Sequence, residues 1–75
     1  MSPPVNDVRP RRINVAITPE AIEALETVMN RERVGLTEAV RRLVSYGDFV
    51  YRAVKIDEAE LLLRKDDGIR EIVLL

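Results

Sequence analysis

The sequence predicts a small, mainly α-helical chain in which one strand precedes two helices and a β-hairpin follows them. Residues 12–18 alternate between apolar and polar side chains, which is the pattern of a half-buried strand. Residues 19–55 repeat apolar side chains every three or four positions, as amphipathic helices do. Residues 60–75 hold two apolar runs on either side of an Asp-Gly turn signal, which predicts the hairpin.

Length and composition limit what this chain can do alone. Its 75 residues suffice for one small domain, which buries only about 60% of the surface of the unfolded chain. The sequence has no cysteine and no histidine, so disulfides, thiolate sites and the commonest transition-metal ligand are excluded. We therefore expect stabilisation by association with another chain, and neither a cofactor nor a metal site.

Charge is distributed unevenly, although the net charge is only −1. Residues 1–12 carry three arginines and one aspartate, residues 13–55 are neutral, and residues 56–75 carry six acidic and three basic side chains. We expect a flexible basic N-terminal arm over residues 1–11, a strand-helix-helix domain over residues 12–55 and a hairpin extension over residues 56–75. The arm has no apolar run, so we expect neither a signal peptide nor a membrane anchor, and a cytoplasmic protein.

The expected strand leads directly into the first helix. Its apolar face comprises Ile13, Val15 and Ile17, and its other face comprises Arg12, Asn14 and Ala16. Thr18 can accept a hydrogen bond from the first helical amides, Pro19 has its φ preset, and Glu20 places a carboxylate at the positive end of the helix. The first helix is therefore expected to begin at Pro19. It should end near Val34, with Gly35 in the left-handed conformation.

A second helix is expected from a cap at Thr37 to about Lys55. Gly47 interrupts its apolar stripe and costs close to 1 kcal/mol there relative to alanine, which indicates that another backbone or a bulky side chain approaches. A kink or an early helix end is the alternative. Two ion pairs are expected on the solvated face, Glu38 with Arg42 and Asp48 with Arg52. The stripe, with the apolar face of the strand, is assigned to the core or a dimer interface: Val40, Leu43, Val44, Gly47, Val50 and Tyr51.

The hairpin is expected to pair residues 60–64 with residues 69–75 across the turn Lys65-Asp66-Asp67-Gly68. Its alternation places four apolar side chains where they can be buried together: Leu61, Leu63, Ile72 and Leu74. Three covers for this face stay open: the chain's own domain, a dimer interface, or another protein. The aspartates lack the further ligands of a calcium loop and are assigned to the turn.

Two segments resemble a known family. They are Arg11-Arg12-Ile13-Asn14-Val15-Ala16-Ile17-Thr18-Pro19-Glu20 and Gly35-Leu36-Thr37-Glu38-Ala39, and the pattern extends over residues 10–54. It resembles the ribbon-helix-helix family of bacterial, phage and plasmid repressors, the Arc and methionine-repressor type. In that family, strands from two subunits pair into an antiparallel ribbon that enters the major groove of DNA. The resemblance implies a homodimeric, sequence-specific transcriptional repressor of double-stranded DNA, with cooperative binding of neighbouring dimers.

The resemblance places base contacts on the outward face of the strand. Arg12 can bond guanine, Asn14 can bond adenine, and Ala16 can touch a thymine methyl group. Ala16 departs from the polar side chain that the family usually has there. The alternative for Arg12 and Asn14 is that they form the wet face of an ordinary surface strand.

The resemblance also places phosphate contacts at two other positions. The start of the second helix offers Thr37 with the amides of Glu38 and Ala39, although a plain helix cap also accounts for Thr37. The arm offers Arg9 and Arg11, for which a solubilising tail is the alternative. Arg41 and Arg42 lie near the start of the second helix, where contact with phosphate and exposure to solvent are equal alternatives.

Two further hypotheses differ in the partner that they assign. An antitoxin-like or adaptor protein would keep the dimer and bind a partner protein through the hairpin. A monomeric α+β interaction module would pair residues 12–18 with the hairpin in a three-stranded sheet and would not read DNA. An enzyme is not expected, because no Ser-His or Cys-His pair can form and the carboxylates lack the spacing of a catalytic site.

Overall fold

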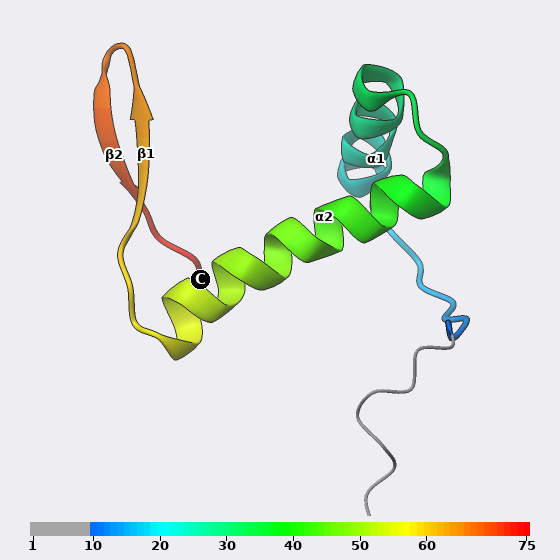
Figure 1. Cartoon of the computed structure of the whole chain (residues 1–75), viewed down its shortest axis with the longest axis horizontal. Helices are drawn as coiled ribbons and strands as arrows, with labels where there is room; N and C mark the ends of the chain where they lie inside the picture. The colour runs from blue at the N-terminus through cyan, green and yellow to red at the C-terminus, as the bar shows by residue number, and fades with distance from the viewer. Residues whose placement is uncertain (1–9) are drawn as a thin grey trace, which may run out of the picture.

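The computed structural model describes residues 10–75 as two helices, a π-helical turn and one antiparallel pair of strands (Figure 1). The elements are α1 (Pro19–Glu32), α2 (Leu36–Tyr51), η1 (Arg52–Ile56), β1 (Leu61–Lys65) and β2 (Gly68–Ile72). α2 and η1 form one long rod, with α1 near one end and the hairpin at the other. Residues 10–18, called the N-terminal segment below, form neither helix nor strand within the chain.

α1 begins where the sequence predicts. Thr18 has an extended backbone, and its Oγ1 accepts a hydrogen bond from the amide of Ala21 at 3.2 Å. Pro19 occupies the first helical position, and the amide of Ile22 donates to the carbonyl oxygen of Thr18 at 3.0 Å. The predicted threonine cap and proline start are therefore confirmed.

The end of α1 differs from the prediction, because Arg33 rather than Gly35 adopts the left-handed conformation, with φ 54° and ψ 52°. The amides of Arg33 and Val34 both donate to the carbonyl oxygen of Met29, which is a Schellman-type helix end. Gly35 instead has φ −79° and is the N-cap of α2. The prediction that Thr37 caps the second helix is wrong as well, because α2 already begins at Leu36, directly after its N-cap Gly35.

The helix formed by α2 and η1 continues to Ile56, close to the predicted end at Lys55. The amide of Asp57 donates to the carbonyl oxygen of Arg52 at 2.9 Å, across the wider spacing of a π-helix. The helix passes through Gly47 without ending. Apart from its chain neighbours and the nearby backbone of its own helix, no described atom lies within 4 Å of the place where a Cβ on Gly47 would stand. The predicted close approach at Gly47 is therefore not made within residues 10–75.

The predicted hairpin is confirmed. β1 and β2 pair antiparallel, with Leu61 opposite Ile72 and Lys65 opposite Gly68. The turn consists of Asp66 and Asp67, neither of which has a positive φ, and the positive φ of 131° falls on Gly68. The sheet contains these two strands alone, so the three-stranded sheet with residues 12–18 is not formed in the described chain.

Packing between the elements of one chain is slight. Ala39 is the one fully buried apolar residue in the described part of the chain. The Cα radius of gyration is 15.8 Å, whereas a compact domain of this length has about 11 Å. Residues 10–75 of a single chain therefore lack a continuous core. In residues 10–75, no helix has the length and apolarity that a bilayer crossing requires.

Candidate nucleic-acid interface

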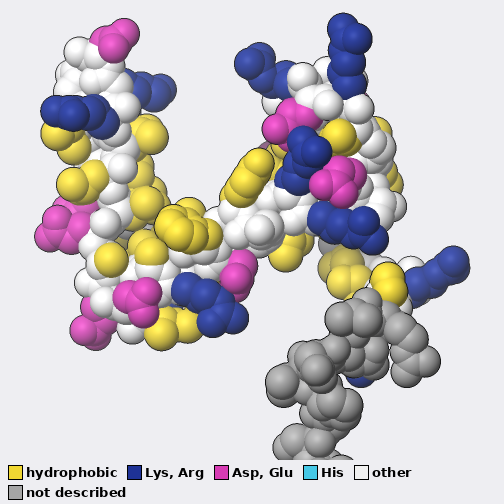
Figure 2. Space-filling model, viewed as in Figure 1, with side chains coloured by type: hydrophobic (Ala, Val, Ile, Leu, Met, Phe, Trp, Pro, Cys, Tyr) yellow, Lys and Arg dark blue, Asp and Glu magenta, His cyan; other side chains and the backbone are white. Residues whose placement is uncertain are grey.

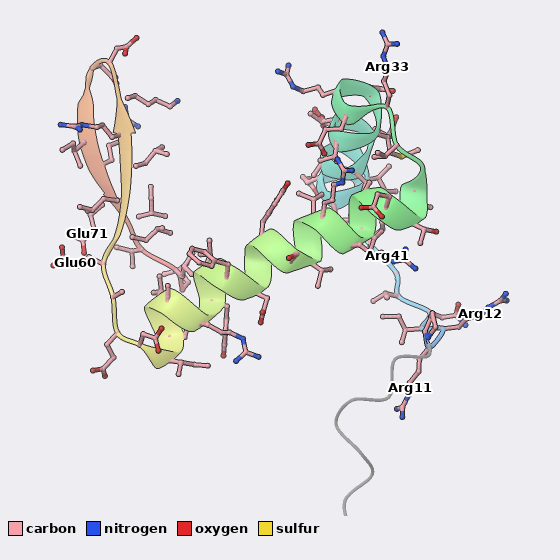
Figure 3. The ribbon with its side chains drawn as sticks, viewed as in Figure 1. Arg11, Arg12, Arg33, Arg41, Glu60 and Glu71 are labelled. Atoms are coloured by element: carbon pink, nitrogen blue, oxygen red, sulfur yellow. The ribbon has the colours of Figure 1, made fainter. Side chains whose placement is uncertain are left out.

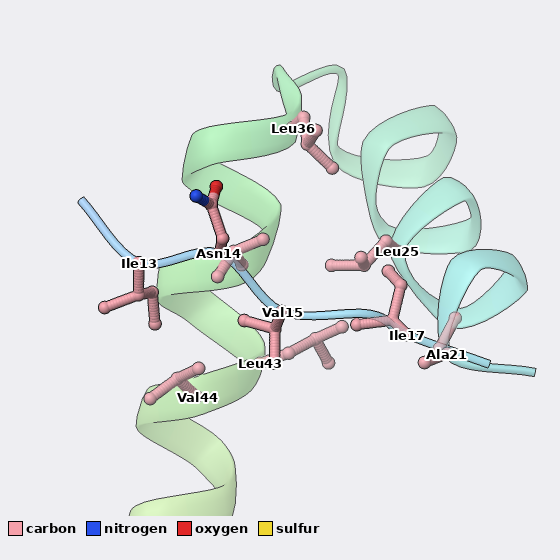
Figure 4. A pocket seen from close by; sticks show the side chains of 11 residues that line it. Ile13, Asn14, Val15, Ile17, Ala21, Leu25, Leu36, Leu43 and Val44 are labelled. Carbon is pink, nitrogen blue, oxygen red and sulfur yellow. The ribbon is translucent and has the colours of Figure 1, made fainter.

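An apolar groove of about 610 Å³ lies between the N-terminal segment and the two helices (Figure 4). Its lining comprises Ile13, Asn14, Val15, Ile17, Ala21, Ala24, Leu25, Leu36, Val40, Leu43 and Val44. Ile13 is 80% exposed and Val15 is 68% exposed, although both side chains border the groove. Ile13 and Val15 of the N-terminal segment therefore lie beside the helices but remain largely exposed.

The side chains of Ile13, Asn14 and Val15 point to alternate sides of the N-terminal segment, as the sequence pattern predicts, whereas Ile17 points toward Leu25 (Figure 4). In Figure 4, the amide of Asn14 projects away from the side on which Ile13 and Val15 lie. Arg12 projects into solvent in Figure 3, and Ala16 is exposed as well. Asn14 also contributes to the lining of the groove. The three predicted base-contacting residues are thus accessible in this conformation.

The predicted phosphate-contacting residues at the start of α2 are only partly suited to that role. The amides of Leu36, Thr37 and Glu38 precede the first hydrogen bond of the helix, which the amide of Ala39 donates to Gly35 at 3.0 Å. The Ala39 amide is used in this bond and its residue is buried, which disfavours the predicted phosphate contact of that amide. Thr37 is exposed at this helix end.

Arg42 connects the two helices. Its guanidinium lies 2.9 Å from a carboxylate oxygen of Glu32 on α1 and 3.1 Å from one of Glu38 on α2. The hydrogen bond to Glu32 and then the one to Glu38 raise the pKa of the Arg42 guanidinium above its ordinary value. Arg42 is therefore occupied by carboxylates, which disfavours the phosphate role. The predicted pairs of Glu38 with Arg42 and of Asp48 with Arg52 are both present, the latter at 2.8 Å.

Arg41 differs from Arg42 in its surroundings. Its side chain is 63% exposed and lies 3.9 Å from Glu38, a long contact that leaves the guanidinium accessible. In Figure 3, Arg41 projects to the side of α2 on which Arg11 and Arg12 lie, whereas Arg33 projects from the far end of α1. Arg11 is exposed, and Arg9 lies outside the described residues. The structure thus favours Arg41 over Arg42 as a phosphate-contacting residue. The sequence pattern alone does not distinguish the two arginines.

The apolar stripe assigned to a core or dimer interface is largely uncovered. Val40, Leu43 and Val44 line the groove, Val50 is half-buried, and Gly47 and Tyr51 are exposed. Two further aromatic side chains that the sequence analysis did not single out are exposed on α2, Tyr46 at 57% and Phe49 at 75%. Hydrophobic side chains are visible along α2 and the hairpin in Figure 2. The exposed apolar surface thus extends well beyond the groove.

Figure 2 shows basic and acidic side chains intermixed on the helices and on the hairpin. Among residues 10–75, no cluster of three potential metal ligands occurs.

Comparison with known proteins gave no match, whether with family models, with curated proteins or with solved structures.

Proposed function

We propose that this chain is one protomer of a ribbon-helix-helix dimer that binds double-stranded DNA and regulates transcription. The observation that carries the proposal is the N-terminal segment, whose apolar side chains Ile13 and Val15 are exposed over an apolar groove while its backbone has no strand partner in the described chain. A backbone left without partners next to apolar surface favours pairing with another strand.

A second copy of the same segment supplies such a partner. When two copies of residues 12–18 pair antiparallel, their apolar side chains all lie on one face of the ribbon, because side chains alternate along each strand. That face can cover the grooves of both protomers. The opposite face then presents Arg12, Asn14 and Ala16 twice, once from each copy.

The chemistry of this outer face suits the major groove. An arginine can donate two hydrogen bonds to guanine, and an asparagine amide can both donate to and accept from adenine. The exposed side chains of Arg11 and Arg41, with the amides at the start of α2, supply phosphate contacts that fix the orientation of the dimer. Because the net charge is −1, this attraction depends on individual arginines and not on the charge of the whole molecule.

Replacement of Asn14 by alanine tests base reading. An operator is first selected from a random duplex library, and affinities are then compared on that operator and on unrelated DNA. We expect the Asn14→Ala variant to lose about 1 to 3 kcal/mol of discrimination per good base contact, while its affinity for unrelated DNA stays the same. Asn30→Ala, which removes an exposed asparagine from α1, is the matched control and should change neither affinity. Equal losses on all sequences for Asn14→Ala would contradict the proposal.

A further inference from the structure

The outer edge of β1 carries a self-complementary arrangement of side chains. β1 pairs with β2 on one side only, and on its other side no strand of the described chain lies beside it. Leu62 and Leu63, in the middle of β1, are about half exposed. An open strand edge of this kind pairs readily with another strand unless its side chains prevent it.

The hairpin geometry decides which backbone groups face this open edge. A two-residue turn closes on a hydrogen-bonded pair, here Lys65 with Gly68, and hydrogen-bonded pairs then alternate along an antiparallel ladder. Leu61 and Leu63 therefore direct their amide and carbonyl groups toward β2. Leu62 and Arg64 direct theirs outward. A strand that pairs with this edge must match this alternation.

We propose that two copies of the chain pair along β1, with Leu62 at the twofold axis, and form a four-stranded antiparallel sheet. In this register Leu62 lies opposite its own counterpart and Leu61 of each copy lies opposite Leu63 of the other. Glu60, the residue directly before β1, lies opposite Arg64 of the other copy once the strand is extended by one residue. The outward backbone groups meet as hydrogen-bonded pairs. Each contact across the new edge is therefore either leucine with leucine or an acid with a base, and both kinds stabilise cross-strand pairs.

Other pairings of the same hairpin are less favourable. Shifting β1 against its copy by one register step that keeps the backbone alternation places, in one direction, Leu62 opposite Arg64 and Glu60 opposite Asp66. In the other direction it places Leu62 opposite Glu60 and requires Glu58, which has a φ of 57°, to extend the strand. Pairing of two copies along the outer edge of β2 is also unfavourable. The two registers centred on this strand place either Glu71 opposite Glu71 or Arg70 opposite Arg70. Like charges directly opposite each other destabilise a sheet. Charge complementarity thus selects the edge, the register and a second copy of this chain as the occupant.

This contact also extends an apolar surface. Leu61 and Ile72 lie opposite each other in the hairpin, and Leu63 follows on the same face. In the four-stranded sheet these residues of both copies adjoin across the twofold axis. The hairpin lies at the end of α2 remote from the N-terminal segment (Figure 1), so the contact leaves the proposed DNA-reading surface uncovered. The contact between the two hairpins does not depend on DNA binding.

Charge reversal tests the pairing through the mass of the full chain in the absence of DNA, measured by sedimentation equilibrium. Glu60→Arg and Arg64→Glu each turn two attractive cross-strand pairs into repulsive ones. We expect each to weaken the hairpin association by roughly tenfold or more. The double variant Glu60→Arg/Arg64→Glu restores opposite charges and should recover the association of the natural chain. Masses that do not respond to the single reversals, or a double variant weaker than both, would overturn the proposal.

Blocking the backbone of the edge gives a second test with a matched control. Leu62→Pro removes an outward amide of β1 without breaking a hydrogen bond to β2, and Ile69→Pro does the same on the outer edge of β2. We expect Leu62→Pro alone to lower the mass. In the natural chain, hydrogen exchange should show protection of the Leu62 and Arg64 amides and fast exchange of the Ile69 and Glu71 amides. Protection of Leu63 reports in each variant that the hairpin is folded, so fast exchange at Leu62 with Leu63 protected would overturn the proposal.

The two associations can be told apart in the same samples. A variant of Val15, described below, weakens the ribbon contact and leaves the hairpin contact in place. If the ribbon dimer does not exist, the charge reversals in β1 convert a dimer to a monomer and the Val15 variant has no effect. If the hairpin contact does not exist, only the Val15 variant changes the mass.

Discussion

Replacement of Val15 by threonine probes the dimer that the N-terminal segment is proposed to form. Threonine has nearly the shape and the strand preference of valine, so the variant changes mainly the polarity of one side chain. In the single chain Val15 is 68% exposed, and a threonine hydroxyl there would remain hydrated. In the ribbon dimer the same hydroxyl is buried between the ribbon and the helices, twice per dimer.

The expected loss follows from that burial. A hydroxyl buried without a hydrogen-bond partner costs about 1 to 3 kcal/mol, and two of them therefore cost at least about 2 kcal/mol of dimer stability. That corresponds to a dissociation constant about 30-fold weaker, since about 1.4 kcal/mol is a factor of ten. Sedimentation equilibrium of the DNA-free protein as a function of concentration, in a Glu60→Arg background that weakens the hairpin association, measures this change.

Ala16→Thr is the matched control for Val15→Thr, because it introduces the same side chain one residue later, on the opposite face of the segment. We expect it to leave the dissociation constant of the dimer within about twofold of the natural value, as surface substitutions usually do. The reasoning is refuted if Val15→Thr leaves dimerisation unchanged, or if the two variants weaken it equally, because either result removes the alternation between an inner and an outer face.

Three further substitutions have outcomes that the structure specifies. Arg11→Ala should make the slope of log affinity against log salt shallower by about 0.9 for each phosphate that Arg11 binds, or about 2 per dimer; an unchanged slope would assign Arg11 to solvent. Arg33→Gly should raise the free energy of unfolding in urea by about 1 kcal/mol, since glycine adopts φ 54° without the steric cost that arginine has there, and a destabilised variant would contradict the left-handed helix end. Gly68→Ala should destabilise the hairpin by about 1 kcal/mol or more because of its φ of 131°, and its readout is faster hydrogen exchange at Leu63 with α1 unaffected.

The elements that the sequence predicts correctly are those determined by local interactions. The start of α1 depends on Thr18 and Pro19, whose side chain and ring act on neighbouring backbone groups. The ion pairs of Glu38 with Arg42 and of Asp48 with Arg52 depend on a spacing of four residues within one helix. The hairpin depends on alternation and on turn residues that are adjacent in sequence.

The incorrect predictions concern positions where two elements meet. The glycine rule places the left-handed residue at Gly35, yet the structure places it at Arg33 and uses Gly35 to begin α2. That choice lets Leu36 enter the first turn of α2 and join the groove beside α1, which is a tertiary contact without a local signal. It also moves the first helical hydrogen bond to the Ala39 amide, which disfavours the predicted phosphate contact of that amide.

The candidate site shows the same division between local and long-range information. Alternation in residues 12–18 predicts which side chains share a face, and the orientations of Ile13, Asn14 and Val15 agree with it. The choice between Arg41 and Arg42 depends on Glu32, which approaches from the other helix at 2.9 Å from Arg42. The pattern within residues 36–51 contains no information on that contact. The partner of the N-terminal segment lies beyond a single chain, and the ribbon therefore stays a prediction.

This chain is proposed to bind DNA as a dimer through its N-terminal segment. The most direct measurement is a salt titration of its affinity for duplex DNA, with the mass of the free protein determined on the same sample. The proposal predicts a free protein of at least two chains and a log-log slope that is clearly negative, about −0.9 for each phosphate contact. A monomeric protein without measurable affinity for DNA at low salt would contradict it.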